Sequence, residues 1–337
     1  MKRVFVLLFA SCLVAAAGVG AYLFHDYNRW LDEPLSTESG GQTLLVPSGA
    51  SFRALVRQLE QEGLLDNAHY FEFLARTSDR AGSIQAGEYH VAAGTTPAEL
   101  LRKLARGRVV QHRFTIIEGW TFSQLRTALE ADPRIVHTLD EADDAEVMRR
   151  LEREGEHPEG WFLPETYHFT RGTEDIAILR RALNAMEERL QGAWEQRERE
   201  TPLKTPYEAL ILASIIERET GRADERRKVS GVFVRRLEQR MRLQTDPTVI
   251  YGMGDAYDGR IRTRDLRTDT PYNTYTRHGL TPTPIAMPSG ASIDAALDPK
   301  DGDALYFVSR GDGSHHFSAT LDEHNRAVRR YILNRED

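Results

Sequence analysis

The sequence predicts an α+β protein that consists of an N-terminal transmembrane helix, a small α/β subdomain and a larger mixed α+β domain. Three observations support this prediction: an uncharged run over residues 4–24, three repeats of a short strand followed by an amphipathic helix, and a helix-rich second half that ends in a hairpin. The chain has 337 residues, which is enough for two or three folded units.

Composition argues against several classes of protein. Hydrophobic residues make up 40% of the chain and charged residues 28%, a globular balance that makes wholesale disorder unexpected. The net charge of -7 argues against a nucleic-acid partner, because such proteins carry a basic domain or stripe. The single cysteine, Cys12, lies in the apolar run, so neither an intramolecular disulfide nor a cysteine-based metal site is expected.

The apolar run is predicted to anchor the protein in a membrane. It holds 21 uncharged residues, enough for a helix to cross a hydrocarbon core of about 30 Å. Lys2 and Arg3 precede it, so the amino terminus is expected in the cytoplasm and the rest of the chain outside. The alternative is a cleaved signal peptide, because Ala15 and Ala17 imitate a cleavage site, although the apolar part of a signal peptide is normally shorter. We expect a cytoplasmic tip and anchor over residues 1–25 and a tether over residues 26–42.

Three similar units follow the tether. Each has a short apolar strand, a glycine, a hydroxyl residue two positions later that caps a helix, and leucines six and ten positions after the glycine that bury one helix face. The members are Gly49, Ser51, Leu55 and Leu59, then Gly94, Thr96, Leu100 and Leu104, then Gly119, Thr121, Leu125 and Leu129.

The first two units are predicted to form a subdomain over residues 43–110. A further helix over residues 67–75 and a strand over residues 87–92 give the order strand–helix–helix–strand. This order resembles a LysM-type glycan-binding module, and the alternative is a purely structural spacer. The third unit belongs to a connecting strand–helix segment over residues 111–156, whose acidic end is expected to be a solvated connector.

The larger domain is predicted over residues 157–337. It opens with an aromatic loop, residues 157–167, that either packs tightly or contacts a ligand. Helices are expected over residues 175–199, 206–220 and 224–241, followed by irregular chain through residue 288. A hairpin over residues 305–318 and a helix capped by Thr320 complete the chain.

The helix over residues 206–220 carries two candidate acids, Glu217 and Glu219. At about 100° per residue their side chains diverge by roughly 200°, so they cannot share a proton. Glu217 continues a stripe with the small residues Ala213 and Ser214, along which a substrate is expected to approach, whereas Glu219 lies closer to the apolar core. An acid at the end of an apolar helix is poorly solvated, which favours its neutral, proton-donating form. The alternative is that both are end-of-helix charges paired with nearby arginines.

Polar and aromatic side chains gather downstream, over residues 244–252 and 272–276, in what is expected to be extended or looped backbone. They offer the donors and acceptors that hydroxyl-rich ligands need. The sequence lacks phosphate-binding, dinucleotide-binding, nucleophile-elbow and HExxH motifs. His315, His316 and His324 have no recognised metal-ligand spacing, so we expect no metal and no cofactor.

Four segments, residues 159–167, 213–220, 244–252 and 272–275, together resemble the endolytic murein transglycosylases of the YceG/MltG-like type. This resemblance covers essentially the whole chain. It implies a single-pass inner-membrane protein with a LysM-like subdomain and a catalytic domain in the periplasm. It also implies cleavage of the β-1,4 bond between N-acetylmuramic acid and N-acetylglucosamine in nascent peptidoglycan, which leaves 1,6-anhydro ends and terminates glycan elongation. Cell-wall synthases such as penicillin-binding proteins are the partners that it implies.

The resemblance places the family's catalytic glutamate on Glu217. The candidates for substrate binding are Ser214, Gln244, Asp246, Thr248, Tyr251, Tyr272, Asn273, Tyr275 and Glu159. The sequence departs from the family pattern after Leu280, where a second proline is usual, and at Ser289, an extra serine before Gly290. Both departures are expected to affect the shape of a loop and its glycan contacts rather than the reaction.

The expected reaction needs a single protein carboxyl group. Glu217 protonates the glycosidic oxygen and then accepts the proton of the muramic acid C6 hydroxyl, which is the nucleophile. One rival is a glycan hydrolase that uses Glu217 with Asp246 or Glu159. The other is a non-catalytic peptidoglycan-binding scaffold, in which Glu217 is replaceable.

Overall fold

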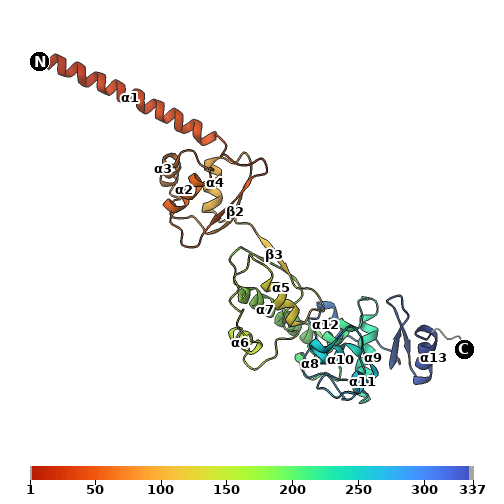
Figure 1. The fold of residues 1–337 in the computed structure, drawn as a ribbon. Coiled ribbons are helices and arrows are strands. Elements are labelled where there is room, and N and C mark those ends of the chain that lie inside the picture. Colours follow the sequence, from red (N-terminus) through yellow and green to blue (C-terminus); the bar gives the residue numbers. More distant parts are fainter. Residues whose placement is uncertain (1, 334–337) are drawn as a thin grey trace. The chain divides into compact units, whose positions relative to one another are not determined.

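The computed structural model describes residues 2–333 as two compact units (Figure 1). The first comprises the chain up to His112 together with Thr170–Gly172, and the second comprises Arg113–Phe169 and the chain from Thr173 onward. The fold is α+β, as predicted: helices dominate, and over residues 2–333 the strands form three two-stranded sheets.

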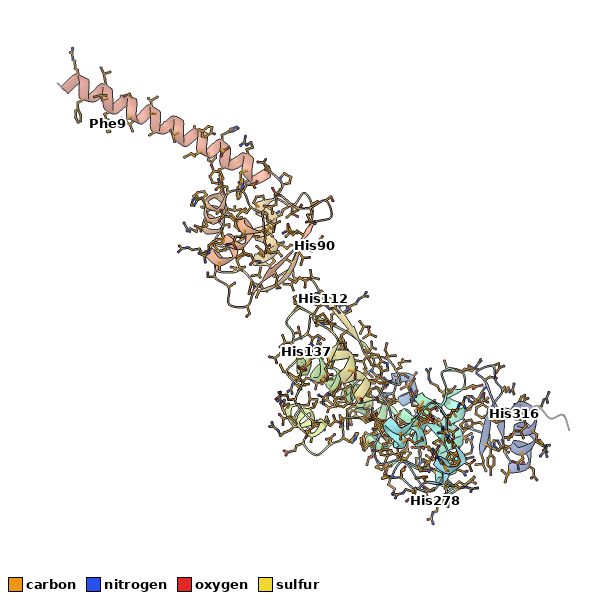
Figure 2. All side chains as sticks on the ribbon, in the orientation of Figure 1. Phe9, His90, His112, His137, His278 and His316 are labelled. Carbon is orange, nitrogen blue, oxygen red and sulfur yellow. The ribbon has the colours of Figure 1, made fainter. Side chains whose placement is uncertain are left out.

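Helix α1 (Lys2–Asp32) contains the predicted anchor but continues beyond it. The segment Leu7–Asp32 is long and apolar enough to cross a membrane. Its side chains over residues 7–25, Phe9 among them, are exposed and project away from the helix (Figure 2). Residues 26–32, predicted as the start of a tether, are helical. The reason is that Trp30, together with Leu35 beyond the helix end, is buried in the apolar core of the first unit.

The predicted strand–helix–helix–strand order of the small subdomain is confirmed. Its elements are β1 (Gln42–Val46), α2 (Phe52–Gln61), α3 (Ala68–Thr77) and β2 (Gly87–Val91), followed by α4 (Pro97–Ala105). Strands β1 and β2 pair antiparallel, with Gln42 opposite Val91 and Val46 opposite Gly87.

The three repeated units are also confirmed, the third as β3 (His112–Thr115) and α5 (Phe122–Glu130). Ser51, Thr96 and Thr121 each accept a backbone N–H bond as the N-cap of the following helix, which satisfies one of its free donors. All six leucines of the repeat are at most 3% exposed, so each helix buries the face that the spacing predicts.

The second unit is built around α8 (Pro206–Glu219). Its residues from Ala209 to Ile216 are at most 4% exposed, because the neighbouring helices α7, α9, α10 and α12 pack against it. The remaining elements are β4 (Thr166–Phe169), which pairs with β3, then α6 (Asp144–Arg150), α7 (Asp175–Gln196), α9 (Arg226–Glu238), α10 (Asp246–Met253), a 3-10 turn (Gly254–Ala256), α11 (Thr263–Arg267) and α12 (Gly290–Leu297).

The chain ends as predicted, in an antiparallel hairpin of β5 (Tyr306–Ser309) and β6 (His315–Ser318) followed by α13 (Leu321–Tyr331). Two other expectations are wrong. The acidic segment before residue 157 is not a solvated connector, because Val147, Met148 and Leu151 on and after α6 are buried in the core. The chain after residue 244 is not all irregular, because Asp246 opens helix α10 with a proline in its first turn.

Candidate active site

Glu217 lies in the last turn of α8 and is held by the N-terminal end of α12. Its Oε2 atom accepts three hydrogen bonds: from the Ser289 backbone N–H at 2.9 Å, from Ser289 Oγ at 2.5 Å and from Ser292 Oγ at 2.7 Å. Among the residues that the structure describes, no hydrogen bond reaches Oε1. The side chain is partly exposed, so one carboxyl oxygen is fixed and the other stays available.

A third segment, the turn after β3, lies beside Glu217 and is hydrogen-bonded to the chain before α12 and to Arg218. The Gly119 N–H donates to Met287 O at 2.9 Å, and the Met287 N–H donates to Trp120 O at 2.7 Å. Arg218 Nη1 donates to Gly119 O at 3.1 Å. Gly119 has a φ of +77°, a backbone conformation that favours glycine, and a Cβ atom there would lie in ordinary contact, 4.0 Å from Glu217 Cγ.

The stripe of small residues on α8 is not the open approach that the sequence suggests. Ala213 and Ser214 are fully buried under the segment that leads into α12. Ser214 Oγ donates to Ile211 O at 2.7 Å and accepts the Ile285 N–H at 3.0 Å, so it fastens this segment to the helix. Substrate access to Glu217 is therefore confined to the end of α8.

Glu219 faces a different element, which confirms that the two acids diverge. Its Oε1 accepts a hydrogen bond from Thr245 Oγ1 at 3.0 Å, at the start of α10. Desolvation of the carboxyl group raises the pKa of Glu219 to about 7, and the nearby negative charge of Asp246 acts in the same direction. Tyr275 donates its hydroxyl to Asp246 Oδ1 at 2.6 Å, so Glu219, Asp246 and Tyr275 form one group.

Three further candidates hold this group in place or flank it. The fully buried Thr248 donates to Thr245 O at 2.7 Å, and the amide of Asn273, also buried, donates to three backbone carbonyl groups between residues 265 and 268. Gln244 is exposed and has a φ of +51°. Thr248 and Asn273 therefore support the backbone, whereas the Gln244 side chain faces solvent.

Glu159 forms a second group with two tyrosines. It is 3% exposed, its Oε1 accepts the Phe122 N–H at 3.0 Å, and it also bonds Tyr251. Burial is the main reason that the pKa of Glu159 is raised to about 7. The rings of Tyr251 and Tyr272 meet edge to face at 4.8 Å. Within the described chain, no hydrogen bond joins either group to Glu217.

Sequence reasoning missed the residues that do contact Glu217. The expectation that Ser289 affects only the shape of a loop and its glycan contacts is wrong, because Ser289 caps α12 and bonds Glu217 directly. Ser292 is not among the candidates that the sequence offers. The available signal was a helix N-cap: Ser289 follows a proline, and its Oγ accepts the Ser292 N–H at 3.2 Å. That signal predicts the helix α12, but it does not predict what the hydroxyl groups face.

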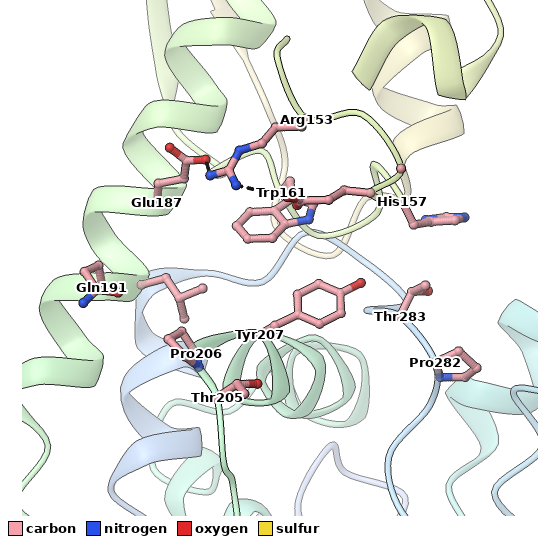
Figure 3. A pocket seen from close by; sticks show the side chains of 13 residues that line it. Arg153, His157, Trp161, Glu187, Gln191, Thr205, Pro206, Tyr207, Pro282 and Thr283 are labelled. Atoms are coloured by element: carbon pink, nitrogen blue, oxygen red, sulfur yellow. Dashed lines mark hydrogen bonds and ion pairs between the residues drawn. The ribbon is translucent and has the colours of Figure 1, made fainter. Parts of the chain in front are cut away.

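The aromatic loop lines a separate cavity of about 770 Å³ at the other end of α8 (Figure 3). Trp161 and Tyr207 stack there with ring centroids 5.7 Å apart. Tyr207 precedes Glu217 by ten residues, which is about 15 Å along a helix. Glu217 does not line this cavity. In the described part of the chain, no group of three or more His, Cys, Asp or Glu side chains is arranged to hold a metal ion.

Comparisons with known proteins agree with the resemblance in the sequence. An endolytic murein transglycosylase of Bacillus subtilis (strain 168) is 30% identical over 336 residues, which cover 94% of this chain and 92% of that protein. An endolytic murein transglycosylase of Streptococcus pneumoniae (strain D39) is 25% identical, and the alignment covers 96% of this chain and 64% of the longer relative.

A crystal structure of a yceG-like protein from Listeria monocytogenes has a similar fold. It matches with a TM-score of 0.56 and 28% identity, over 86% of this chain and 99% of that one. The model of the YceG-like family matches residues 44–330. Because that match covers most of the chain and the Bacillus relative aligns along nearly its whole length, this chain belongs to the YceG-like family.

Proposed function

We propose that this protein is an endolytic lytic transglycosylase of peptidoglycan, with Glu217 as its acid and base. The observation that carries the proposal is the set of three hydrogen bonds on Glu217 Oε2, which leaves Oε1 for proton transfer. The names of the Bacillus and Streptococcus relatives support the activity and the substrate class.

In the first half of the reaction, the proton on Glu217 Oε1 moves to the glycosidic oxygen while the bond from that oxygen to the muramic acid C1 breaks. N-acetylglucosamine leaves with a new hydroxyl group. The negative charge that develops on Glu217 is stabilised at Oε2 by Ser289 and Ser292, because donors to a carboxylate favour its charged form.

In the second half, the muramic acid C6 hydroxyl attacks C1 and forms the 1,6-anhydro ring. Its proton returns to Glu217 Oε1, so the enzyme is regenerated and no water is consumed. One carboxyl group serves both steps, since the nucleophile belongs to the substrate.

The position of the other carboxyl groups favours this reaction over hydrolysis. A hydrolase needs a second carboxyl group across the scissile bond from the acid. Glu159 is buried and bonded to the Phe122 N–H, and Asp246 belongs to the group around Glu219, which faces away from Glu217. Neither is suited to activate a nucleophile beside Glu217.

The glycan contacts proposed are Gln244 and Asp246, which are exposed, together with Tyr251, Tyr272 and Tyr275, which are partly exposed. The buried Ser214, Thr248, Asn273 and Glu159 are proposed to set the shape of the site.

The remaining parts of the proposal concern place and partners. Helix α1 is proposed to span the inner membrane once, with the bulk of the chain in the periplasm, which the apolar span and the preceding Lys2 and Arg3 support. The first unit is proposed as a LysM-like glycan-binding module. Release of anhydro ends within nascent strands would terminate elongation beside cell-wall synthases such as penicillin-binding proteins.

The decisive experiment is mass spectrometry of uncrosslinked polymeric glycan after incubation with the full-length protein in detergent, beside the Glu217→Gln variant. We expect 1,6-anhydro-muramic ends from the wild type and none from the variant. Reducing ends would indicate a hydrolase instead. Binding of glycan without cleavage by either protein would indicate a scaffold.

A further inference from the structure

Within the first unit, the small subdomain contacts α1 at the place where the apolar run ends. The uncharged residues stop at Phe24, and Tyr27 and Trp30 follow on the same continuous helix. The ring of Tyr27 meets the rings of Tyr70 and Phe73 on α3, with centroids 5.4 Å and 5.3 Å apart. Helix α3 is therefore packed against the membrane-proximal end of the anchor.

Polar contacts fix the same junction. Tyr70 donates its hydroxyl to Asp26 Oδ2 at 2.9 Å, and the ring of Trp30 lies 5.6 Å from that of Tyr70. Trp30 is 9% exposed, within the core of the first unit. Because the helix is continuous and its end is buried in that core, the unit cannot swing freely about α1.

The level of this junction follows from helix geometry. Tyr27 is three residues beyond Phe24, which corresponds to about 4.5 Å along the axis. If residues 4–24 fill the hydrocarbon core, Tyr27 and the rings that touch it lie in the interfacial layer, where tyrosine and tryptophan concentrate.

Phe73 has the exposure that a membrane contact requires. It is 53% exposed although it touches Tyr27, and Phe24 is 70% exposed, so an apolar surface runs from the anchor on to α3. His69 and Arg76, one turn before and after Phe73, are exposed on the same helix face. Arg76 pairs with Glu72 at 2.8 Å, and its side chain, which is 67% exposed, stays accessible to lipid phosphate groups.

We propose that α3 is a second membrane contact, in which Phe73 enters the interfacial layer of the bilayer that α1 spans. This inference rests on the proposed anchoring of α1. The contact holds the first unit directly on the periplasmic surface of the inner membrane, in place of a flexible tether. A glycan-binding module held there meets a strand close to the membrane.

The test places a fluorescent probe beside Phe73. In a Cys12→Ser background, His69→Cys is labelled with an environment-sensitive dye, and the full-length protein is reconstituted into phosphatidylethanolamine–phosphatidylglycerol vesicles. The control label is on Ala86→Cys, which is exposed just before β2. The start of β2 lies beside the chain that leads on to β3, because Glu88 O accepts the Val110 N–H at 2.7 Å. Nitroxide-labelled lipid is then added as a quencher.

We expect blue-shifted emission and quenching of the probe at position 69. At position 86 we expect the unquenched emission of a probe in water. Phe73→Ser should reverse the shift at position 69, because it removes the inserted ring and leaves the buried Phe71 in place. Aqueous emission at position 69 in protein that resists carbonate extraction would overturn the membrane contact alone. Release of the chain by carbonate would overturn the anchor and the contact together.

Discussion

Ser289 donates two hydrogen bonds to one oxygen of Glu217, from its backbone N–H at 2.9 Å and from its hydroxyl at 2.5 Å. The same hydroxyl oxygen accepts the N–H of Ser292 and so caps α12. The orientation of the acid is therefore tied to the formation of a helix whose first residue lies 73 positions further along the chain than the acid.

Ser292→Ala tests this arrangement without removing the cap. The variant loses the 2.7 Å hydroxyl bond to Glu217 Oε2, whereas the backbone bonds of α12 remain. A hydrogen bond to a charged group contributes about 1.5–3 kcal/mol, so kcat should fall roughly 10- to 100-fold with little change in KM. Counting anhydro-muramic ends over time by mass spectrometry gives both constants.

Ser289→Ala is the matched comparison. It removes a bond to the same oxygen and also the N-cap, so it should add a loss of about 0.5–2 kcal/mol in the free energy of unfolding. A wild-type kcat in Ser292→Ala would show that the hydroxyl groups pack beside Glu217 without supporting its chemistry.

Glu217→Gln and Glu219→Gln form a pair two residues apart on one helix. Glu217→Gln should lower the rate about 10²- to 10⁴-fold, because the amide cannot donate and take back a proton. Its carbonyl oxygen still accepts the bonds from Ser289 and Ser292, so the melting temperature should change little.

Glu219→Gln should keep most of the activity near pH 6. The raised pKa of about 7 means that Glu219 is largely neutral there, and a glutamine resembles the neutral carboxyl group that Thr245 contacts. Equal loss of activity in the two variants would contradict the assignment of acid chemistry to Glu217 alone.

Glu159 should make the second unit less stable as the pH rises. Its pKa is about 7 in the folded protein and about 4.3 in an unfolded chain. Between these values the folded state binds more protons, so the free energy of unfolding falls with rising pH, by at most about 1.4 kcal/mol per pH unit. Below the unfolded-state pKa, Glu159 contributes its full stabilisation of the folded state. This stabilisation is lost as the pH rises through the folded-state pKa of about 7.

Urea unfolding of the full-length protein in detergent at pH 5, 6, 7 and 8, followed by tryptophan fluorescence, measures this slope. Glu159→Gln keeps an acceptor for the Phe122 N–H and removes the titration. The free energy of unfolding of the variant minus that of the wild type should therefore increase with pH. A difference that is independent of pH would show that the buried carboxyl group does not titrate in this range.

The parts of the fold that follow from local chemistry were predictable. Thr96 with Pro97 and Glu99 specifies the start of α4, and the leucine spacing specifies which helix face is buried. These signals act within one or two helical turns, so a single sequence contains them in full.

The site was predictable only in part, because its contacts are long-range. The spacing on α8 correctly separated Glu217 from Glu219, since both lie on one helix. Nothing local shows that the segment leading into α12 covers Ser214, or that Ser289, 72 positions further along the chain, faces the acid. The pattern of polar residues after position 244 predicts ligand contacts, although several of them satisfy buried backbone groups instead.

Asn273 illustrates that last distinction and allows a test. Its side chain donates to the carbonyl groups of Asp265, Leu266 and Thr268 and accepts the Tyr275 N–H at 2.8 Å. The amide has two N–H groups to share among these three acceptors and one oxygen that accepts. At about 1 kcal/mol for each of these three groups, Asn273→Ala should cost roughly 3 kcal/mol and lower the melting temperature by roughly 6–12 °C.

Gln244→Asn is the comparison for Asn273→Ala, because its side chain is exposed and asparagine tolerates the φ of +51° at this position. It should leave the melting temperature unchanged and raise KM if Gln244 contacts the glycan. A raised KM with unchanged melting temperature in Asn273→Ala would instead make Asn273 a direct ligand of the substrate, because loss of a buried support cannot weaken binding without also weakening the fold.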